Sequence, residues 1–346
     1  NNNNSTLLLN YYDACIYQRD LNLLHDKSAW LNDACINFYM TYLSRSQPAR
    51  WGQFWQRFSS GSEEHDGKKG GGNNNESSSS SKSRTIKDSN SGKDDDSNNN
   101  DFKKREEEEK IMFLDPSVIS FMMHQCDDED LHDLASSWTI TGTKRFFIPI
   151  NDNFGASKRK FGIPGGGNHW SLLLVVLMIQ GEQNNATSSC EEEGEGAKGG
   201  NEIDEAISAK TRPRMCFLHF DSCRGHNTQS AKVVAKRFHR AVKLAFDDDN
   251  NDIDNDIMTI IECNNPQQYN SYDCGVHTLM AAEALSDPSL LCATNASEIE
   301  AIQKVHVDTL NTWFGRNGGH GGAALSMRQK MVDEIQKLSK IYLDKE

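Results

Sequence analysis

Apolar side chains recur at helical spacing shortly after the N-terminus of the chain. They follow Trp30-Leu31-Asn32-Asp33, in which Asn32 or Asp33 can serve as the N-cap of a helix. The apolar face of the expected helix consists of Ile36, Phe38, Tyr39, Met40 and Leu43. The pattern therefore predicts an ordered region over residues 1–58, with a helix that begins near Asp33.

Four apolar segments in the middle of the chain predict β-strands. They cover residues 146–150, 171–179, 215–220 and 257–261. The second is a continuous apolar run, which is typical of a strand covered on both faces. We expect both of its faces to be buried.

Helical patterns surround these strands. Asp115-Pro116 precedes a short apolar segment and puts proline at the first helical position, where its missing N–H costs nothing. Further helices are predicted for residues 228–246, 275–285, 297–314 and 324–343. Strands in the middle and helices at both ends predict an α+β fold.

Three segments are too polar to bury enough surface to offset the entropy of ordering them. They cover about residues 59–110, 181–212 and 247–256. We expect these segments to be disordered inserts, and the remaining residues fit one large domain. The expected organisation is a single domain over residues 1–346.

Composition restricts the classes of function. The net charge is −13, whereas phosphate binding requires a concentrated basic face, so nucleic acid is not an expected partner. The longest apolar run, residues 172–179, is too short to span a bilayer. The nine cysteines include no Cys-x-x-Cys pair, which argues against a disulfide framework and a zinc site. We expect a reducing compartment, the cytoplasm or nucleus, and neither metal nor cofactor.

Asp273-Cys274-Gly275 lies where a loop meets an expected helix start. Unpaired backbone N–H groups and the positive end of the helix dipole favour a thiolate at such a place. Gly275 would allow the backbone of a substrate to approach closely. Taken alone, a cysteine before an apolar helix is more often a core residue, so other groups must support a catalytic interpretation.

Two further polar groups lie at strand ends. Asn168-His169-Trp170 directly precedes the buried strand, and a general base at His169 can there reach both a nucleophile and a substrate. Asp221 follows the third strand and can orient an imidazole on a neighbouring strand. His219 competes for the role of base, but it lies within an apolar strand, so we interpret it as packed or bonded to a neighbour.

Gln268 lies six residues before Cys274, and its side-chain amide can donate a hydrogen bond to an oxyanion. Without the cysteine nearby it would be an ordinary polar loop residue. The chain order of histidine, aspartate, glutamine and cysteine differs from that of papain, which begins with its cysteine. Together the four residues are typical of a thiol hydrolase.

Four segments resemble the ubiquitin-like-protein protease family, which includes the SUMO (sentrin) proteases. They are Trp30-Leu31-Asn32-Asp33, Gly167-Asn168-His169-Trp170-Ser171-Leu172-Leu173, His219-Phe220-Asp221-Ser222 and Gln268-Tyr269-Asn270-Ser271-Tyr272-Asp273-Cys274-Gly275. The resemblance implies a papain-like α+β fold with a central mixed sheet flanked by helices. It also implies that His169 is the base, Asp221 its orienting partner, Cys274 the nucleophile and Gln268 the oxyanion donor.

The resemblance further implies a ubiquitin-like modifier as the partner of a monomeric enzyme. Trp170 and Trp30 would clamp the modifier's Gly-Gly tail, because only glycines are slim enough to pass between two indoles, although Trp30 can also be read as a core anchor. Asp33 is expected to contact substrate as well. Asp152 and Asn153 would lie on a mobile loop that closes over the tail. Cys274 would attack the last glycine's carbonyl, giving a thioester that water resolves.

Residues 150–153 and 270–275 resemble the deneddylase branch, which acts on the Nedd/Rub modifier, as does the short segment before the first motif. The alternatives are a SUMO protease, an acyltransferase on the same scaffold and a non-catalytic modifier-binding module. Acyltransferases of this type usually carry glutamate in place of Asp221. The polar inserts depart from the family pattern, and extra residues at Lys158-Arg159-Lys160 fall within the expected closing loop.

Overall fold

A central sheet organises the chain. The computed structural model describes residues 3–60, 110–138, 143–155, 167–178, 214–246, 258–287 and 296–343. Within these ranges the sheet has the order β3-β4-β5-β6-β7. Its strands are β3 (Lys110–Phe113), β4 (Thr143–Asn151), β5 (Trp170–Met178), β6 (Arg214–Phe220) and β7 (Ile260–Glu262). The outer pairs are parallel and the inner pairs antiparallel, so the predicted mixed sheet is confirmed.

The continuous apolar run in β5 is covered on both faces, as its sequence predicts. Leu172 and Leu174 point into one hydrophobic cluster, and Leu173 and Val175 point into the other. All four side chains are fully buried. Side chains alternate between the faces of a strand, so a strand between two cores must be apolar at every position.

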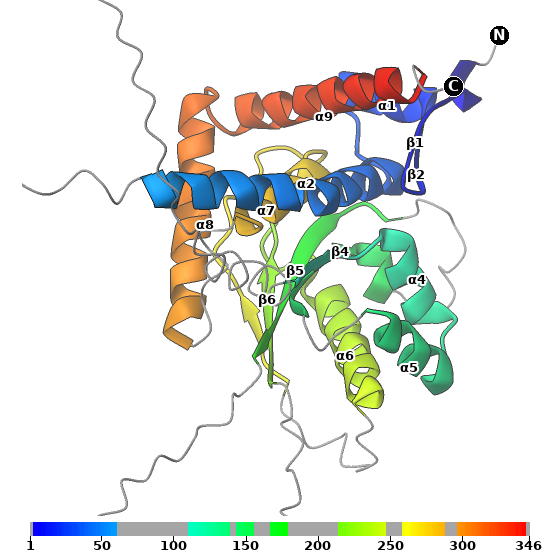
Figure 1. Cartoon of the computed structure of the whole chain (residues 1–346), viewed down its shortest axis with the longest axis vertical. Helices are drawn as coiled ribbons and strands as arrows, with labels where there is room; N and C mark the ends of the chain where they lie inside the picture. Colours follow the sequence, from blue (N-terminus) through cyan, green and yellow to red (C-terminus); the bar gives the residue numbers. More distant parts are fainter. Residues whose placement is uncertain are drawn as a thin grey trace, which may run out of the picture.

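Three helices cover one face of the sheet: α4 (Pro116–His124), α5 (Asp128–Ser137) and α6 (Thr228–Ala245). Asp115 caps α4 by accepting a hydrogen bond from the backbone N–H of Ser117 at 2.6 Å, as the Asp115-Pro116 pair predicts. The cluster on this face includes Val234 and Phe238 of α6. Figure 1 shows these helices together on the right-hand side of the sheet.

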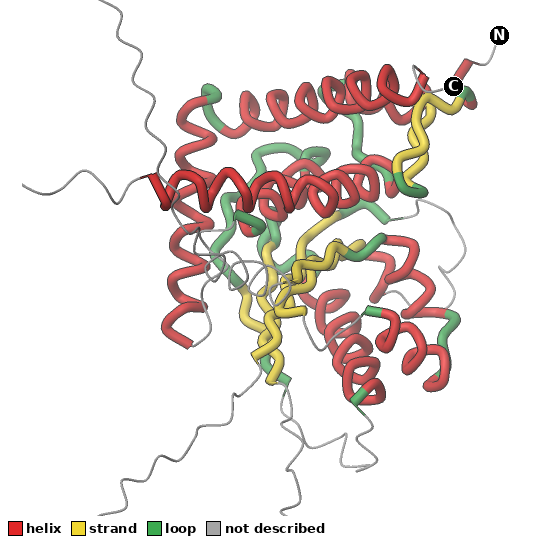
Figure 2. Tube along the Cα trace, viewed as in Figure 1, coloured by secondary structure: helices red, strands yellow, loops and turns green. Residues whose placement is uncertain are grey.

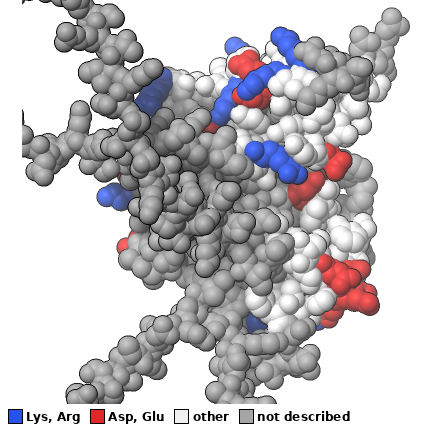
Figure 3. Space-filling view, in the orientation of Figure 1, with Lys and Arg blue, Asp and Glu red and all other residues white. Residues whose placement is uncertain are grey.

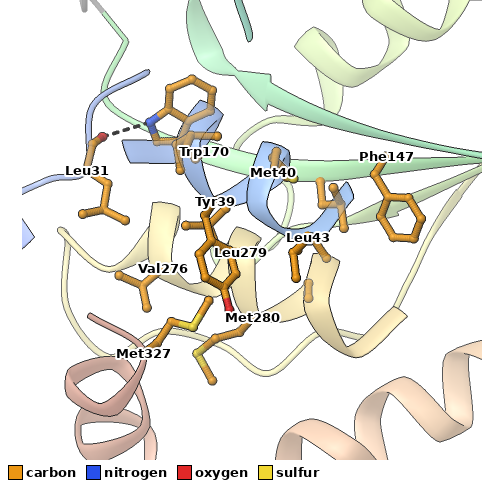
Figure 4. Packing of buried hydrophobic residues seen from close by; sticks show 14 of the residues in the cluster. Leu31, Tyr39, Met40, Leu43, Phe147, Trp170, Val276, Leu279, Met280 and Met327 are labelled. Atoms are coloured by element: carbon orange, nitrogen blue, oxygen red, sulfur yellow. Dashed lines mark hydrogen bonds between the residues drawn. The ribbon is translucent and has the colours of Figure 1, made fainter. Parts of the chain in front are cut away.

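The other face carries α2 (Asp33–Ser60), α7 (Cys274–Leu285), α8 (Ala296–Arg316) and α9 (His320–Leu343) (Figures 1 and 2). Asn32 is the N-cap of α2, because its side-chain oxygen accepts from the backbone N–H of Cys35 at 3.1 Å. Figure 4 shows the packing between these helices. Its labelled side chains include Tyr39, Met40 and Leu43 of α2, Val276, Leu279 and Met280 of α7 and Met327 of α9.

The N-terminal region contains elements that the sequence pattern did not predict individually. A two-stranded hairpin, β1 (Leu7–Tyr11) and β2 (Ala14–Tyr17), precedes α1 (Gln18–His25), and a 3-10 turn, η1 (Asn3–Ser5), begins the described chain. The hairpin buries Leu9 and Ile16 against the same cluster as α2. The general expectation of an ordered start is therefore confirmed.

The three expected inserts lie outside the described residues, apart from the edges of the first. Ser59 and Ser60 continue α2, and Lys110 begins β3. The first insert was therefore predicted slightly too wide, because the end of a helix and the start of a strand carry polar side chains that composition alone cannot separate from a loop. The prediction of a single domain over 1–346 stays a prediction.

Acidic side chains gather over α5 at the lower right of the molecule (Figure 3). Asp127 caps this helix, and Asp128, Glu129 and Asp130 occupy its first turn. Negative charge at a helix N-terminus interacts favourably with the helix dipole and stabilises the helix. Among the helices in the described ranges, none is long and apolar enough to cross a membrane.

Candidate active site

Cys274 is the first residue of α7, as the sequence predicts, and its side chain is buried. The residue that follows it, Gly275, lies close to Leu31. A Cβ atom at position 275 would lie 3.1 Å from the Leu31 Cβ and 3.3 Å from Ile36 Cδ1. A side chain here would press on Leu31 and Ile36, so glycine lets the Trp30-Leu31 loop pack closely against the start of the cysteine helix.

His169 lies between Cys274 and Asp221. Its Nε2 is 2.6 Å from Oδ1 of Asp221, and the ring also makes a hydrogen bond with the Cys274 side chain. With Nε2 engaged by the carboxylate, Nδ1 is the ring nitrogen left for sulfur. Burial lowers the pKa of His169, but the bonds to Asp221 and Cys274 and the charges on both outweigh burial and raise the pKa to about 9.

The sheet topology explains why His169 and Asp221 meet. β5 and β6 are antiparallel and pair Leu172 with Phe220. The residue before β5 and the residue after β6 therefore lie at the same end of this strand pair. The Asp221 carboxylate accepts backbone N–H bonds from Cys223 at 2.9 Å and Asn227 at 3.1 Å. Burial raises the pKa of Asp221, but the bond to His169 and these amide bonds lower it overall, so the carboxylate is ionised.

His219 is not available as a competing base. Its Nδ1 is 2.8 Å from Oε2 of Glu262, its Nε2 is 2.9 Å from the Ser171 hydroxyl, and its side chain is fully buried. Both ring nitrogens therefore have partners inside the sheet. The interpretation of His219 as a neighbour-satisfied residue is confirmed.

Gln268 is held on both sides of its amide group. Its Oε1 accepts from the Ser222 hydroxyl at 2.7 Å, and its Nε2 donates to the Asn270 carbonyl at 2.6 Å. The amide nitrogen carries two hydrogens, so one stays available for another acceptor. Its role as oxyanion donor is compatible with these bonds and stays a prediction.

The two tryptophans predicted to clamp the substrate differ in exposure. Trp170 is 4% exposed and donates from its indole to the Leu31 carbonyl at 3.2 Å (Figure 4), whereas Trp30 is 39% exposed. Asp33 starts α2 at the surface beside this loop. The bond from Trp170 brings the Trp30 loop to the start of β5, but the indole of Trp170 itself is largely enclosed.

Asp152 supports His169 directly. Its carboxylate accepts backbone N–H bonds from Asn168 at 2.8 Å and His169 at 3.3 Å, and its own N–H donates to the His169 carbonyl at 3.1 Å. The N–H of Asn153 donates to the Asn151 side chain at 3.0 Å. Both residues belong to the 3-10 turn η3 (Asp152–Gly155). Most of the expected closing loop lies outside the described residues, so its motion stays a prediction.

Asn227 is a site residue that sequence reasoning missed. Its side-chain nitrogen lies 3.1 Å from the Ile150 carbonyl, 3.3 Å from the His169 carbonyl and 3.0 Å from the Ser171 hydroxyl. Its backbone N–H also donates to Asp221. One buried residue therefore bonds to both the histidine and the aspartate segments. A signal existed, because Asn227 directly precedes the predicted helix start at Thr228.

The arrangement can carry out nucleophilic acyl transfer. A buried carboxylate orients an imidazole, and the imidazole contacts a sulfur at the N-terminus of a helix. An imidazolium beside a cysteine is the arrangement that activates sulfur nucleophiles. Within the described residues, no group of three or more histidine, cysteine, aspartate or glutamate side chains is placed to hold a metal ion.

Known proteins match most of this chain. Residues 98–314 match the model of the Ulp1 protease family, C-terminal catalytic domain. A probable sentrin-specific protease 8 of Dictyostelium discoideum is 22% identical over 81% of this chain and 74% of its own length. Sentrin-specific protease 8 of Homo sapiens is 21% identical over 81% of each chain. A NEDD8-specific protease 1 of Arabidopsis thaliana is 26% identical over 50% of this chain and 55% of its own.

Among solved structures, that of a de-sumoylating protease is similar, with a TM-score of 0.48 at 15% identity. The match covers 95% of this chain and 88% of that chain.

Proposed function

The chain belongs to the Ulp1 protease family, and on that premise we propose that it is a deneddylase, a cysteine protease that cleaves after the C-terminal Gly-Gly of a Nedd/Rub-type modifier. The observation that carries the proposal is the contact of His169 with both Asp221 and Cys274. The relative named NEDD8-specific protease 1 supports the choice of modifier.

In the proposed reaction, His169 takes the proton from Cys274 or holds it as an imidazolium beside the thiolate. The sulfur attacks the carbonyl of the modifier's last glycine, and the oxyanion forms near the start of α7 and Gln268. His169 then protonates the leaving amine, which is a lysine side chain or the next residue of a precursor. Water attacks the thioester, the bond to sulfur breaks, and the modifier leaves with a free carboxylate.

A nucleophilic thiol must stay reduced to work. We therefore propose the cytoplasm, the nucleus or both as the compartment. The proposed partners are a ubiquitin-like modifier and its conjugates, and the proposed working unit is the monomer.

Cleavage of two modifier fusions tests the proposal. We expect the purified chain to cut a NEDD8 fusion at least ~10-fold faster than a SUMO fusion, because recognition of the modifier contributes to kcat/KM. Equal or reversed rates would reject the deneddylase branch in favour of a SUMO protease. Absence of cleavage of either fusion would reject protease activity on these modifiers.

A cysteine substitution identifies the nucleophile. Cys274→Ser should lower kcat by roughly 10⁴-fold and retain modifier binding, because removing one member of a catalytic unit removes nearly all of its effect. The matched control is Cys15→Ser, which changes a half-buried thiol in the β1–β2 hairpin and should keep wild-type activity. Full activity in Cys274→Ser would mean that another group is the nucleophile.

A further inference from the structure

The residue before Cys274 does not cap its helix in the usual way. Asp273 is the N-cap of α7, yet its side chain makes no hydrogen bond to the amides of the first turn. An aspartate at an N-cap normally accepts from the second or third helical N–H. Here Oδ1 accepts from Nη2 of Arg328 at 3.1 Å, and Oδ2 accepts from Nδ2 of Asn270 at 2.8 Å. Both carboxylate oxygens therefore have partners other than the amides of the helix start.

Arg328 comes from α9 and is almost fully buried, at 2% exposure. Besides Asp273, its guanidinium donates to three backbone carbonyls of the segment before Trp30. The distances are 2.6 Å to Ala29, 3.1 Å to Leu23 and 3.3 Å to Asp26. These three bonds position the guanidinium independently of Asp273. The guanidinium therefore offers the Asp273 carboxylate a hydrogen-bond donor at a fixed place.

The first amides of a helix have no partners within the helix. At the start of α7 these amides belong to Cys274 and the residues after it, and they can donate to an oxyanion that forms on a substrate carbonyl. A carboxylate that turned onto them would occupy those donors. It would also add a negative charge beside the sulfur and disfavour the thiolate.

We propose that Arg328 is a positioning residue of the active site, which holds the Asp273 carboxylate away from the N-terminus of α7. The amides and the positive end of the helix are thereby left to Cys274 and to the oxyanion. The proposal rests on the proposed function, because it assigns Arg328 a task in the reaction of Cys274.

Several charged or titratable groups lie around the start of α7. His169 and Cys223 interact with the Cys274 side chain, and Asp221 bonds to His169. Asp273 directly precedes Cys274, His277 lies in the first turn of α7, and Arg328 of α9 bonds to Asp273. Of these, Asp273 and Arg328 form a pair of opposite charges. Removing one member of this pair must therefore shift the charge around the sulfur in a direction that depends on which member is removed.

The test compares Arg328→Met, Asp273→Ala and the double variant. The pH dependence of Cys274 alkylation by iodoacetamide is measured, with kcat and KM on a NEDD8 fusion. Arg328→Met should raise the midpoint of the alkylation profile by about one pH unit, and Asp273→Ala should lower it. Arg328→Met should also lower kcat by at least ~10-fold with little change in KM, because the oxyanion donors act in the transition state.

The double variant separates positioning from a general loss of structure. Without the carboxylate, no negative side chain at position 273 can turn onto the α7 amides, so Arg328→Met/Asp273→Ala should recover kcat by about 5-fold or more over Arg328→Met alone. Midpoints that move in the same direction in both single variants, or do not move, would overturn the proposal. A double variant no faster than Arg328→Met would overturn it too.

Lys330→Met is the matched control, because it removes a different ion pair of α9, with Glu283, and should leave the alkylation midpoint unchanged. If Arg328→Met does not fold, Asp273→Ala still decides: an unshifted midpoint overturns the proposal, and a lowered one supports it. Failure of the wild-type chain to cleave the fusion would reject the proposed protease, whereas the alkylation profiles would still report on Arg328.

Discussion

At the scale of single residues, carboxylates hold the backbone that carries the reactive groups. Asp152 binds the amides of Asn168 and His169, and Asp221 binds the amides of Cys223 and Asn227. Charge-assisted bonds of this kind are stronger than neutral ones. They orient the imidazole of His169 before a substrate arrives, which is what preorganised catalysis requires.

The raised pKa of His169 predicts a pH dependence of stability. Its ordinary value is 6.5 and its value in the fold is about 9, so the folded state binds the proton more tightly than the unfolded chain does. The contribution to stability is complete below pH 6.5 and is lost as the pH rises through 9. Urea unfolding of wild type and His169→Gln should therefore show a difference in unfolding free energy that shrinks over this range. A constant difference would contradict the assignment.

Asn227 predicts a loss of both stability and rate. Asn227→Ala removes the bonds to the carbonyls of Ile150 and His169 and to Ser171, at a cost of about 1–3 kcal/mol. Because His169 loses a support, kcat should fall as well. Asn317→Ala is the control, since that side chain bonds to the Trp313 carbonyl at the end of α8 and should change stability only. Unchanged kcat in Asn227→Ala would show that its bonds are purely structural.

The sequence alone indicated the candidate catalytic residues but not Asn227 and Arg328, which bond to the segments around them. His169, Asp221 and Cys274 lie at predicted strand or helix ends, where functional side chains gather. Asn227 and Arg328 act through backbone carbonyls and through Asp273, and such partners are known only once β4, β5 and α9 are placed beside them. Neither residue belongs to a motif that names its partners in advance.

At the scale of elements, long periodic or continuous patterns predicted well and short ones did not. β5 and α6 were found because an apolar run and a helical period extend over many residues. The β1–β2 hairpin was missed because its turn uses Tyr12 and Asp13 with φ of 49° and 70° in place of the usual glycine. β3 was missed as well, because it has only four residues and follows a highly charged segment.

Trp170 links β5 to the loop before α2, and a conservative substitution tests that link. Trp170→Phe keeps an aromatic ring in the core but removes the donor to the Leu31 carbonyl. We expect a loss of about 1–3 kcal/mol in stability, from the unpaired carbonyl, and a kcat/KM lowered about 10-fold because the Trp30 loop shifts.

The control for this substitution lies on the other face of the sheet. Trp138 is equally buried and stacks on Phe238, with ring centroids 5.1 Å apart. Trp138→Phe should reduce stability by packing loss and leave kcat/KM at the wild-type level. Equal losses of kcat/KM in the two variants would mean that Trp170 acts only as a core residue.

At the scale of the whole molecule, the site forms where the start of α7 meets the ends of two inner strands of the sheet. His169 and Asp221 come from the ends of β5 and β6, Cys274 from α7 and Arg328 from α9. The cluster of α2, α7 and α9 side chains sets the position of α7 against the sheet (Figure 4). The catalytic geometry therefore depends on tertiary packing from nearly the whole length of the described chain, from Leu31 to Arg328.

The central claim is that Cys274 attacks the carbonyl at the end of a modifier tail, and one labelling measurement tests it most directly. A NEDD8 derivative whose C-terminal glycine carries an electrophile is incubated with the wild-type chain, and the modified cysteine is mapped by mass spectrometry. We predict one adduct, on Cys274, although Cys223 is more exposed. Labelling of Cys223 or another thiol, or no adduct at all, would contradict the account.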